Sequence, residues 1–309
     1  MRSHEFESSS VTLLPHGHLS LSCISYLNDL IRTCPNLYEI SLNFTSSYEL
    51  DLVAHGLQPS SDSLVNISFE SYSSHKIRRL LPASLVQEAL GLPLFHRIKQ
   101  LRLVSIENDT TIRRPALALA PTMLCINDNF AKITHVAQFF PTDRSSLVRF
   151  SFRVLNLQTI QLRWLLEWLP RRIQEISISH NAGFISIIDH PTLTRYAQDH
   201  SLPSITLDLV SRFTSLHTLI LNEFQGPSVA LLHTLVTASP SLVIIDFARS
   251  YWIKIDGSYP AHSGLLMEAV FPLSEVLSAV VAFRHLDFIH FGWLPTRDWK
   301  YCDGLIMNL

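Results

Sequence analysis

Aspartate and histidine stand side by side twice in one short polar stretch, DHPTLTRYAQDH. The pairs are Asp189-His190 and Asp199-His200. A carboxylate beside an imidazole can support general acid–base catalysis, so a hydrolytic α/β enzyme using the loop near 180–200 is one functional hypothesis. No GxSxG nucleophile elbow accompanies the pairs, and an exposed loop is the alternative interpretation. We therefore expect no catalytic residues and a protein that is not an enzyme.

Metal-ligating residues are not spaced as a metal site. The closest histidine pair is His16 and His18, and no third ligand follows from the spacing. The chain has only nine glycines and no glycine-rich loop of the kind that cradles phosphates. The four cysteines are scattered without any CxxC pair: Cys23, Cys34, Cys125 and Cys302. The sequence predicts reduced thiols, no metal and no cofactor.

A repeated apolar triplet, apolar–x–x–apolar–x–apolar, sets the positions of the other polar residues that could bind a partner. Leu216, Leu219 and Leu221 form one copy, and another begins 26 residues later at Leu242. Further copies begin at residues 37, 64, 98, 121, 147, 173 and 286. The starts at 121, 147 and 173 are also 26 apart, whereas the steps of 43 from 173 and 44 from 242 require insertions or a degenerate copy. Each triplet predicts a buried strand.

The segments between triplets read as helices that end at proline. Residues 19–37, 157–173 and 227–242 each carry an apolar helical period, and a proline stands just before the next triplet. Proline lacks a backbone N–H and disfavours helical geometry in the residue before it, so it ends a helix sharply. The predicted unit is therefore strand, turn, helix and stop.

This pattern resembles leucine-rich-repeat proteins and, more narrowly, the degenerate repeats of fungal F-box-associated proteins, in which CPNLYEISL and SPSLVIIDF are typical phrases. The resemblance implies an α/β fold: a single leucine-rich-repeat domain over 1–309, with repeats over roughly 20–292 and irregular caps. Such a solenoid, or horseshoe, has parallel strands on its concave face and helices on its convex face. An ordinary globular α/β domain is the alternative.

The turns depart from the family pattern. An Asn commonly follows the last apolar residue of the triplet by three positions and bonds the turn backbone. Asn129 and Asn181 match, whereas Phe224 and Ser250 are among the residues that replace it. The departure predicts irregular turns without affecting the alternation of strands and helices.

Residues between the apolar positions of each triplet are expected to point outward onto the concave face, because side chains alternate along a strand. The middle of that face is predicted to be basic, with acidic residues such as Glu39 and Asp246 to either side. Bidentate arginine contacts there would suit an acidic or phosphorylated segment of a protein partner, and ordinary solvated charges are the alternative. The predicted partner-binding residues are Lys99, Arg102, Arg149, Ser151, Arg153, Ser177, His217, Asn222 and Asp246.

Bulk properties agree with a binding module. The chain has 309 residues, 47% hydrophobic and 16% charged, and its net charge of −2 argues against nucleic-acid binding. No run approaches 18 consecutive apolar residues, and MRSHEFESSS has no signal-peptide core, so we expect no membrane contact and an intracellular location in cytoplasm or nucleus.

The expected function is a non-enzymatic protein–protein interaction scaffold. The resemblance implies more narrowly the substrate-recognition part of an SCF-type ubiquitin ligase receptor. No F-box is recognisable, so an SCF adaptor is an expected partner only if an F-box exists outside this chain.

Overall fold

A computed structural model describes part of the chain, and its contacts form two compact units, residues 1–147 and 148–309. The single repeat domain over 1–309 stays a prediction, and each unit is described by itself. The described residues are 9–12, 25–26, 28–29, 37–42, 66–70, 81–82, 86, 90–91, 98–104, 106–107, 119–128, 140–154, 157–180, 205–224, 227–250, 252, 273–294, 302–303 and 306–308.

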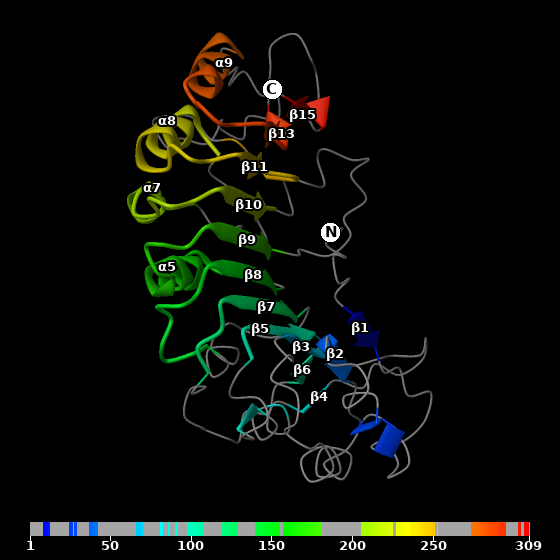
Figure 1. Ribbon diagram of the computed structural model, residues 1–309. Helices are drawn as coiled ribbons and strands as arrows, with labels where there is room; N and C mark the ends of the chain where they lie inside the picture. The colour runs from blue at the N-terminus through cyan, green and yellow to red at the C-terminus, as the bar shows by residue number, and fades with distance from the viewer. Residues whose placement is uncertain are drawn as a thin grey trace, which may run out of the picture. The chain divides into compact units, whose positions relative to one another are not determined.

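The first unit contains parallel strands that pair in the order β1-β2-β3-β5-β7 (Figure 1). Their bounds are β1 Ser9–Thr12, β2 Leu37–Leu42, β3 Asn66–Glu70, β5 Gln100–Val104 and β7 Met123–Asp128. A separate short parallel pair joins β4, Leu81–Pro82, to β6, Ile106–Glu107. Part of the expected helix 19–37 is described, and Ser25, Tyr26, Asn28 and Asp29 are helical there.

The second unit pairs its strands in the order β8-β9-β10-β11-β12-β15, parallel except for the last pair. Four helices lie beside these strands in chain order (Figure 1). The strands are β8 Arg149–Val154, β9 Glu175–His180, β10 Thr218–Asn222, β11 Ile244–Asp246, β12 Phe288–His290 and β15 Ile306–Asn308, with a small antiparallel pair of β13 Trp293–Leu294 and β14 Cys302–Asp303. The helices are α5 Thr159–Trp168, α7 Leu207–Val210, α8 Val229–Ala238 and α9 Leu273–Val281. The fold is therefore mixed α/β, with a mostly parallel sheet that does not close.

The apolar triplets align with one another across neighbouring strands. Leu219 lies opposite Ile245, which lies opposite Ile289, and each is the second member of its triplet. In the first unit Ile40, Ile67 and Leu101 align in the same way. Matching triplet positions are therefore adjacent even where the chain between them varies in length. The register follows because a shift by one residue would turn every apolar side chain to the opposite face.

The two long steps between triplets are insertions rather than hidden strands. β9 pairs directly with β10, and β11 pairs directly with β12. No strand can therefore lie between the members of either pair, although 43 and 44 residues separate the triplet starts. Residues 181–204 and 253–272, which belong to these two steps, lie wholly outside the described residues.

The triplets form the core. In the second unit their members are at most 6% exposed, and Phe150, Phe152, Phe247 and Phe291 are among the largest fully buried side chains. Trp168 of α5 packs against Phe150 with ring centroids 5.9 Å apart, so the helix covers the buried face of the strand. The two tryptophans of α5 therefore differ, because Trp168 packs against the strand whereas Trp164 is 40% exposed.

Both described helices that precede a proline end where the sequence predicts. α5 ends at Trp168, two residues before Pro170, and α8 ends at Ala238, two residues before Pro240. The C-cap Ser239 is fully buried, and its hydroxyl donates to the carbonyl of Phe213. The proline stop thus also places a serine where it bonds the preceding repeat, 26 residues earlier.

α8 begins at a serine cap whose removal we expect to cost about 1 kcal/mol. Ser228 is 3% exposed, and its hydroxyl accepts the Leu231 N–H at 3.1 Å. Ser228→Ala should lower the free energy of unfolding by that amount, measured by urea denaturation, because the N–H loses its acceptor. Ser228→Gly should cost only a few tenths of a kcal/mol. An alanine variant as stable as the wild type would contradict a capping role.

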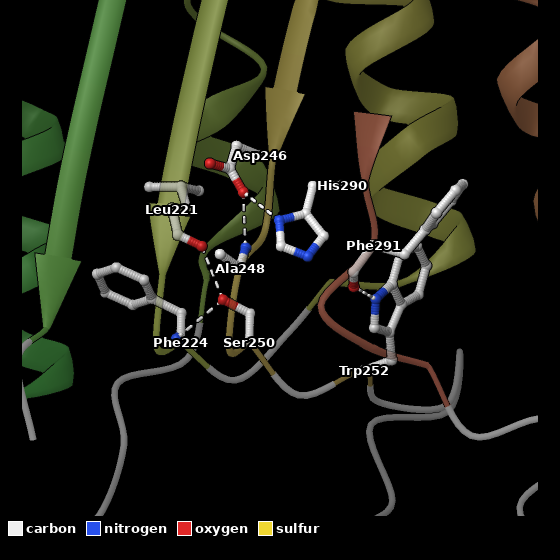
Figure 2. A network of polar contacts seen from close by, with 8 residues as sticks. All are labelled: Leu221, Phe224, Asp246, Ala248, Ser250, Trp252, His290 and Phe291. Carbon is white, nitrogen blue, oxygen red and sulfur yellow. Dashed lines mark hydrogen bonds and ion pairs between the residues drawn. The ribbon is translucent and has the colours of Figure 1, made fainter. Parts of the chain in front are cut away.

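A serine bonds the turn backbone where the family pattern has asparagine. Ser250 stands three residues after Phe247, the last apolar residue of its triplet, and is fully buried. Its hydroxyl accepts the Phe224 N–H at 3.1 Å and donates to the Leu221 carbonyl at 2.7 Å (Figure 2). At this position the departure from asparagine therefore retains a side-chain bond to the turn. Asn129 and Asn181 lie outside the described residues.

The C-terminal residues add a strand beside β12. β15 runs antiparallel to β12, with Ile306 opposite His290 and Met307 opposite Ile289. Ile306–Asn308 therefore pair along the edge of β12, where their backbone groups hydrogen-bond that strand.

Candidate functional site

The second unit has one sheet face that is neither apolar nor fully buried, and we call it the open face. Its side chains alternate with the buried triplet residues along β8, β9, β10, β11 and β12. Residues aligned across parallel strands project from the same side, so the register places them in rows. The open face consists of Arg149, Ser151, Arg153, Glu175, Ser177, Ser179, Thr218, Ile220, Asn222, Ile244, Asp246, Phe288 and His290.

The β8 end of the open face is basic, but one of its two arginines is neutralised. Arg149 Nε lies 3.2 Å from Glu175 Oε1 on the neighbouring strand. Both side chains are about half exposed, at 54% and 42%, so the pair contributes little to stability. Arg153 is exposed and aligns with Ser179 on β9. The predicted basic character therefore rests mainly on Arg153 in this unit.

The predicted binding residues on and beside β8, β9 and β10 differ in exposure and in hydrogen bonding. Ser151 and Ser177 align on β8 and β9 and are half-buried. His217 lies just before β10, is exposed, and its Nδ1 is 2.9 Å from the Ser215 carbonyl. Asn222 ends β10, and its side-chain Oδ1 is buried without a hydrogen-bond partner. A hydrogen-bond donor of a bound molecule that reached this oxygen would therefore be favourable.

Asp246 and His290 form the one acid–base pair that the described open face brings together. The His290 Nδ1 lies 3.0 Å from Asp246 Oδ1, and the same oxygen accepts the Ala248 N–H at 2.8 Å (Figure 2). The side chains are 20% and 24% exposed, so both are partly shielded yet reachable. The residues come from β11 and β12 and are 44 positions apart in sequence.

The geometry defines the hydrogen-bonding character of His290. An ionised carboxylate only accepts hydrogen bonds, so Nδ1 must carry the proton that points at Asp246. In the neutral ring, Nε2 is then an acceptor. This arrangement can accept a hydrogen bond from a bound molecule or take its proton.

The turns after these strands hold the pair in place. Glu223 and Arg249, at equivalent positions of consecutive repeats, have positive φ angles of 66° and 57° and pair at 3.2 Å. Trp252 is 5% exposed, and its indole N–H donates to the Phe291 carbonyl next to His290 (Figure 2). Trp252 is therefore a packed residue of the structure beside His290.

Other predicted residues lie elsewhere. Lys99 and Arg102 are exposed in the first unit, where the Lys99 carbonyl accepts the Thr122 and Met123 N–H groups. The Asp/His pairs near 180–200 and His16 and His18 lie outside the described residues. Within the described residues no group of three or more His, Cys, Asp or Glu side chains could hold a metal ion. Cys125 is unpaired.

Seven residues of the open face were not among the predicted binding residues, and two of these, His290 and Glu175, form polar pairs with predicted residues. His290 was visible in the sequence as the residue between the last two apolar positions of its triplet, the same place that Asp246 occupies in the preceding copy. Glu175 precedes the second apolar position of its own triplet. The repeat alignment was therefore a signal for both, but only the pairing of strands shows which side chains meet.

No family model matches the chain, and the search of curated proteins finds no match either. Among the described residues, no helix has the length and apolar character needed to cross a membrane. The open face with its Asp246–His290 pair is thus the candidate site, and its chemistry has to be argued from its own geometry.

Proposed function

We propose that the chain is a leucine-rich-repeat-type scaffold that binds another protein through the open face. The observation that carries the proposal is the asymmetry of the strands in the second unit. Their triplet side is buried at 0–6% exposure, whereas the other side presents Ser177, Ile220 and Asp246 at intermediate exposure. A sheet with one packed face and one accessible polar face suits recognition of a partner surface.

The composition of the open face also favours binding over catalysis. It combines two arginines, a glutamate, hydroxyl groups, apolar side chains and the Asp246–His290 pair across five neighbouring strands. Protein interfaces commonly mix a partly apolar centre with polar groups in this way. The narrower proposal, from the resemblance alone, is the substrate-recognition part of an SCF-type ubiquitin ligase receptor. The hydrolytic alternative uses residues near 180–200 and stays a prediction.

The test is affinity purification with quantitative mass spectrometry, using the full chain and a charge added to the open face. Ser177→Arg places a long cation on a half-buried strand position of that face. We expect it to reduce recovery of specific partners about tenfold or more, since a misplaced charge at an interface centre costs over 1 kcal/mol. Adaptor and cullin subunits among the partners would support the receptor role.

The matched control is His233→Arg, which adds the same charge to the exposed side of α8. This variant should recover the same partners as the wild type, and both variants should keep the wild-type melting temperature. Equal recovery by the Ser177 variant and the wild type would contradict binding through the open face.

A further inference from the structure

The Asp246–His290 pair is surrounded on the open face by apolar side chains. The register places Ile220 beside Asp246 on one side and Ile306 of β15 beside His290 on the other. Ile244 and Phe288 form the next row of the same face. Ile306 is 53% exposed, and the other three have intermediate exposure. We call these four residues and the pair the apolar ring.

A single acceptor at the centre of apolar surface defines what fits it. With Nδ1 held by Asp246, the neutral His290 ring offers Nε2 as an acceptor. Apolar contact with the ring residues favours a large apolar side chain, and the acceptor favours one that also carries a donor. Tyrosine and tryptophan combine these properties, which is why they are enriched at protein interfaces.

We infer that the apolar ring binds a tryptophan or tyrosine side chain of the partner protein, whose N–H or O–H donates to His290 Nε2. The inference rests on the proposed function, because it names the chemistry of the partner at that same face. Asp246 acts as a positioning residue, since it orients the imidazole without touching the partner.

The experiment measures binding of the full chain to four synthetic peptide pools. Each pool has degenerate flanks and one fixed central residue, which is tryptophan, tyrosine, phenylalanine or lysine. At about pH 8 we expect the wild type to retain the tryptophan and tyrosine pools about fivefold or more over phenylalanine, because phenylalanine leaves the acceptor unpaired.

Two substitutions separate the hydrogen bond from the shape of the ring. His290→Phe keeps apolar surface and should remove the preference for tryptophan and tyrosine over phenylalanine. His290→Gln keeps a donor toward Asp246 and an acceptor toward the partner, so the preference should remain. His285→Gln, at an exposed histidine before β12, should behave as the wild type.

Equal retention of the tryptophan and phenylalanine pools by the wild type, or an undiminished preference in His290→Phe, would overturn the inference. The wild-type comparison does not depend on any variant folding correctly. If the pools are not distinguished but Ser177→Arg still abolishes partner recovery, the open face binds a partner and only the aromatic inference fails. If Ser177→Arg has no effect, the proposed function itself fails.

Discussion

Gly292→Ala is expected to lower the free energy of unfolding by roughly 2–4 kcal/mol, the sum of left-handed backbone strain and overpacking. Gly292 has a φ of +66°, a conformation that residues with a Cβ rarely adopt. A Cβ built there would lie 2.1 Å from the Phe247 carbonyl oxygen and 2.9 Å from that of Ser250. Both obstacles are backbone atoms, so no side chain can move aside. Urea denaturation with a fluorescence readout measures the loss.

Two further substitutions separate the causes of this loss. Asparagine tolerates positive φ better than alanine but still carries a Cβ. Gly292→Asn should therefore be about as destabilising as Gly292→Ala if overlap with Phe247 dominates. Arg249→Gly removes a side chain at another positive-φ position, where φ is 57°, and should change stability by less than about 1 kcal/mol. A Gly292→Ala variant as stable as the wild type would contradict the positive φ and the close approach to Phe247 at this turn.

Ser250→Ala is expected to cost roughly 2–6 kcal/mol, since it leaves two buried backbone groups unsatisfied at about 1–3 kcal/mol each. The Phe224 N–H loses its acceptor and the Leu221 carbonyl loses its donor. Phe224 is fully buried, so water cannot readily replace the hydroxyl. Thermal and urea unfolding of the full chain measure the cost.

The matched control is Ser177→Ala, another strand-associated serine, which is half-buried on the open face. It should change the free energy of unfolding by less than about 0.5 kcal/mol. A local readout is amide hydrogen exchange at Phe224, which should accelerate in Ser250→Ala before global unfolding. Unchanged exchange at that amide, together with unchanged stability, would contradict the role of Ser250.

Much of the strand architecture could be predicted from the triplets. They identified which residues are buried and which copies align, from Ile40 opposite Ile67 to Ile245 opposite Ile289. The prediction succeeds because alternation and burial are local properties, and a one-residue slip would turn the apolar side chains outward. The helix ends before Pro170 and Pro240 were likewise local, since they depend on the chemistry of proline.

The candidate site was only partly predictable. The sequence placed Arg149, Ser177 and Asp246 on an outward face, and their positions agree with that alternation. It did not reveal that Glu175 neutralises Arg149, because the partner lies on the next strand. A basic patch inferred by counting arginines therefore overstates the charge that a partner would meet.

The sequence by itself predicted the strands that carry the triplets and the alternation of buried and outward residues along them, because apolar side chains at a period of two are buried on one face. Only the tertiary structure decided that the long steps insert no strand between β9 and β10, or between β11 and β12. It alone brings Asp246 to His290 and the Ser250 hydroxyl to Phe224. Such contacts depend on which strands lie side by side. Because insertions of unequal length separate the strands in the sequence, the number of residues between two side chains does not predict the distance between them.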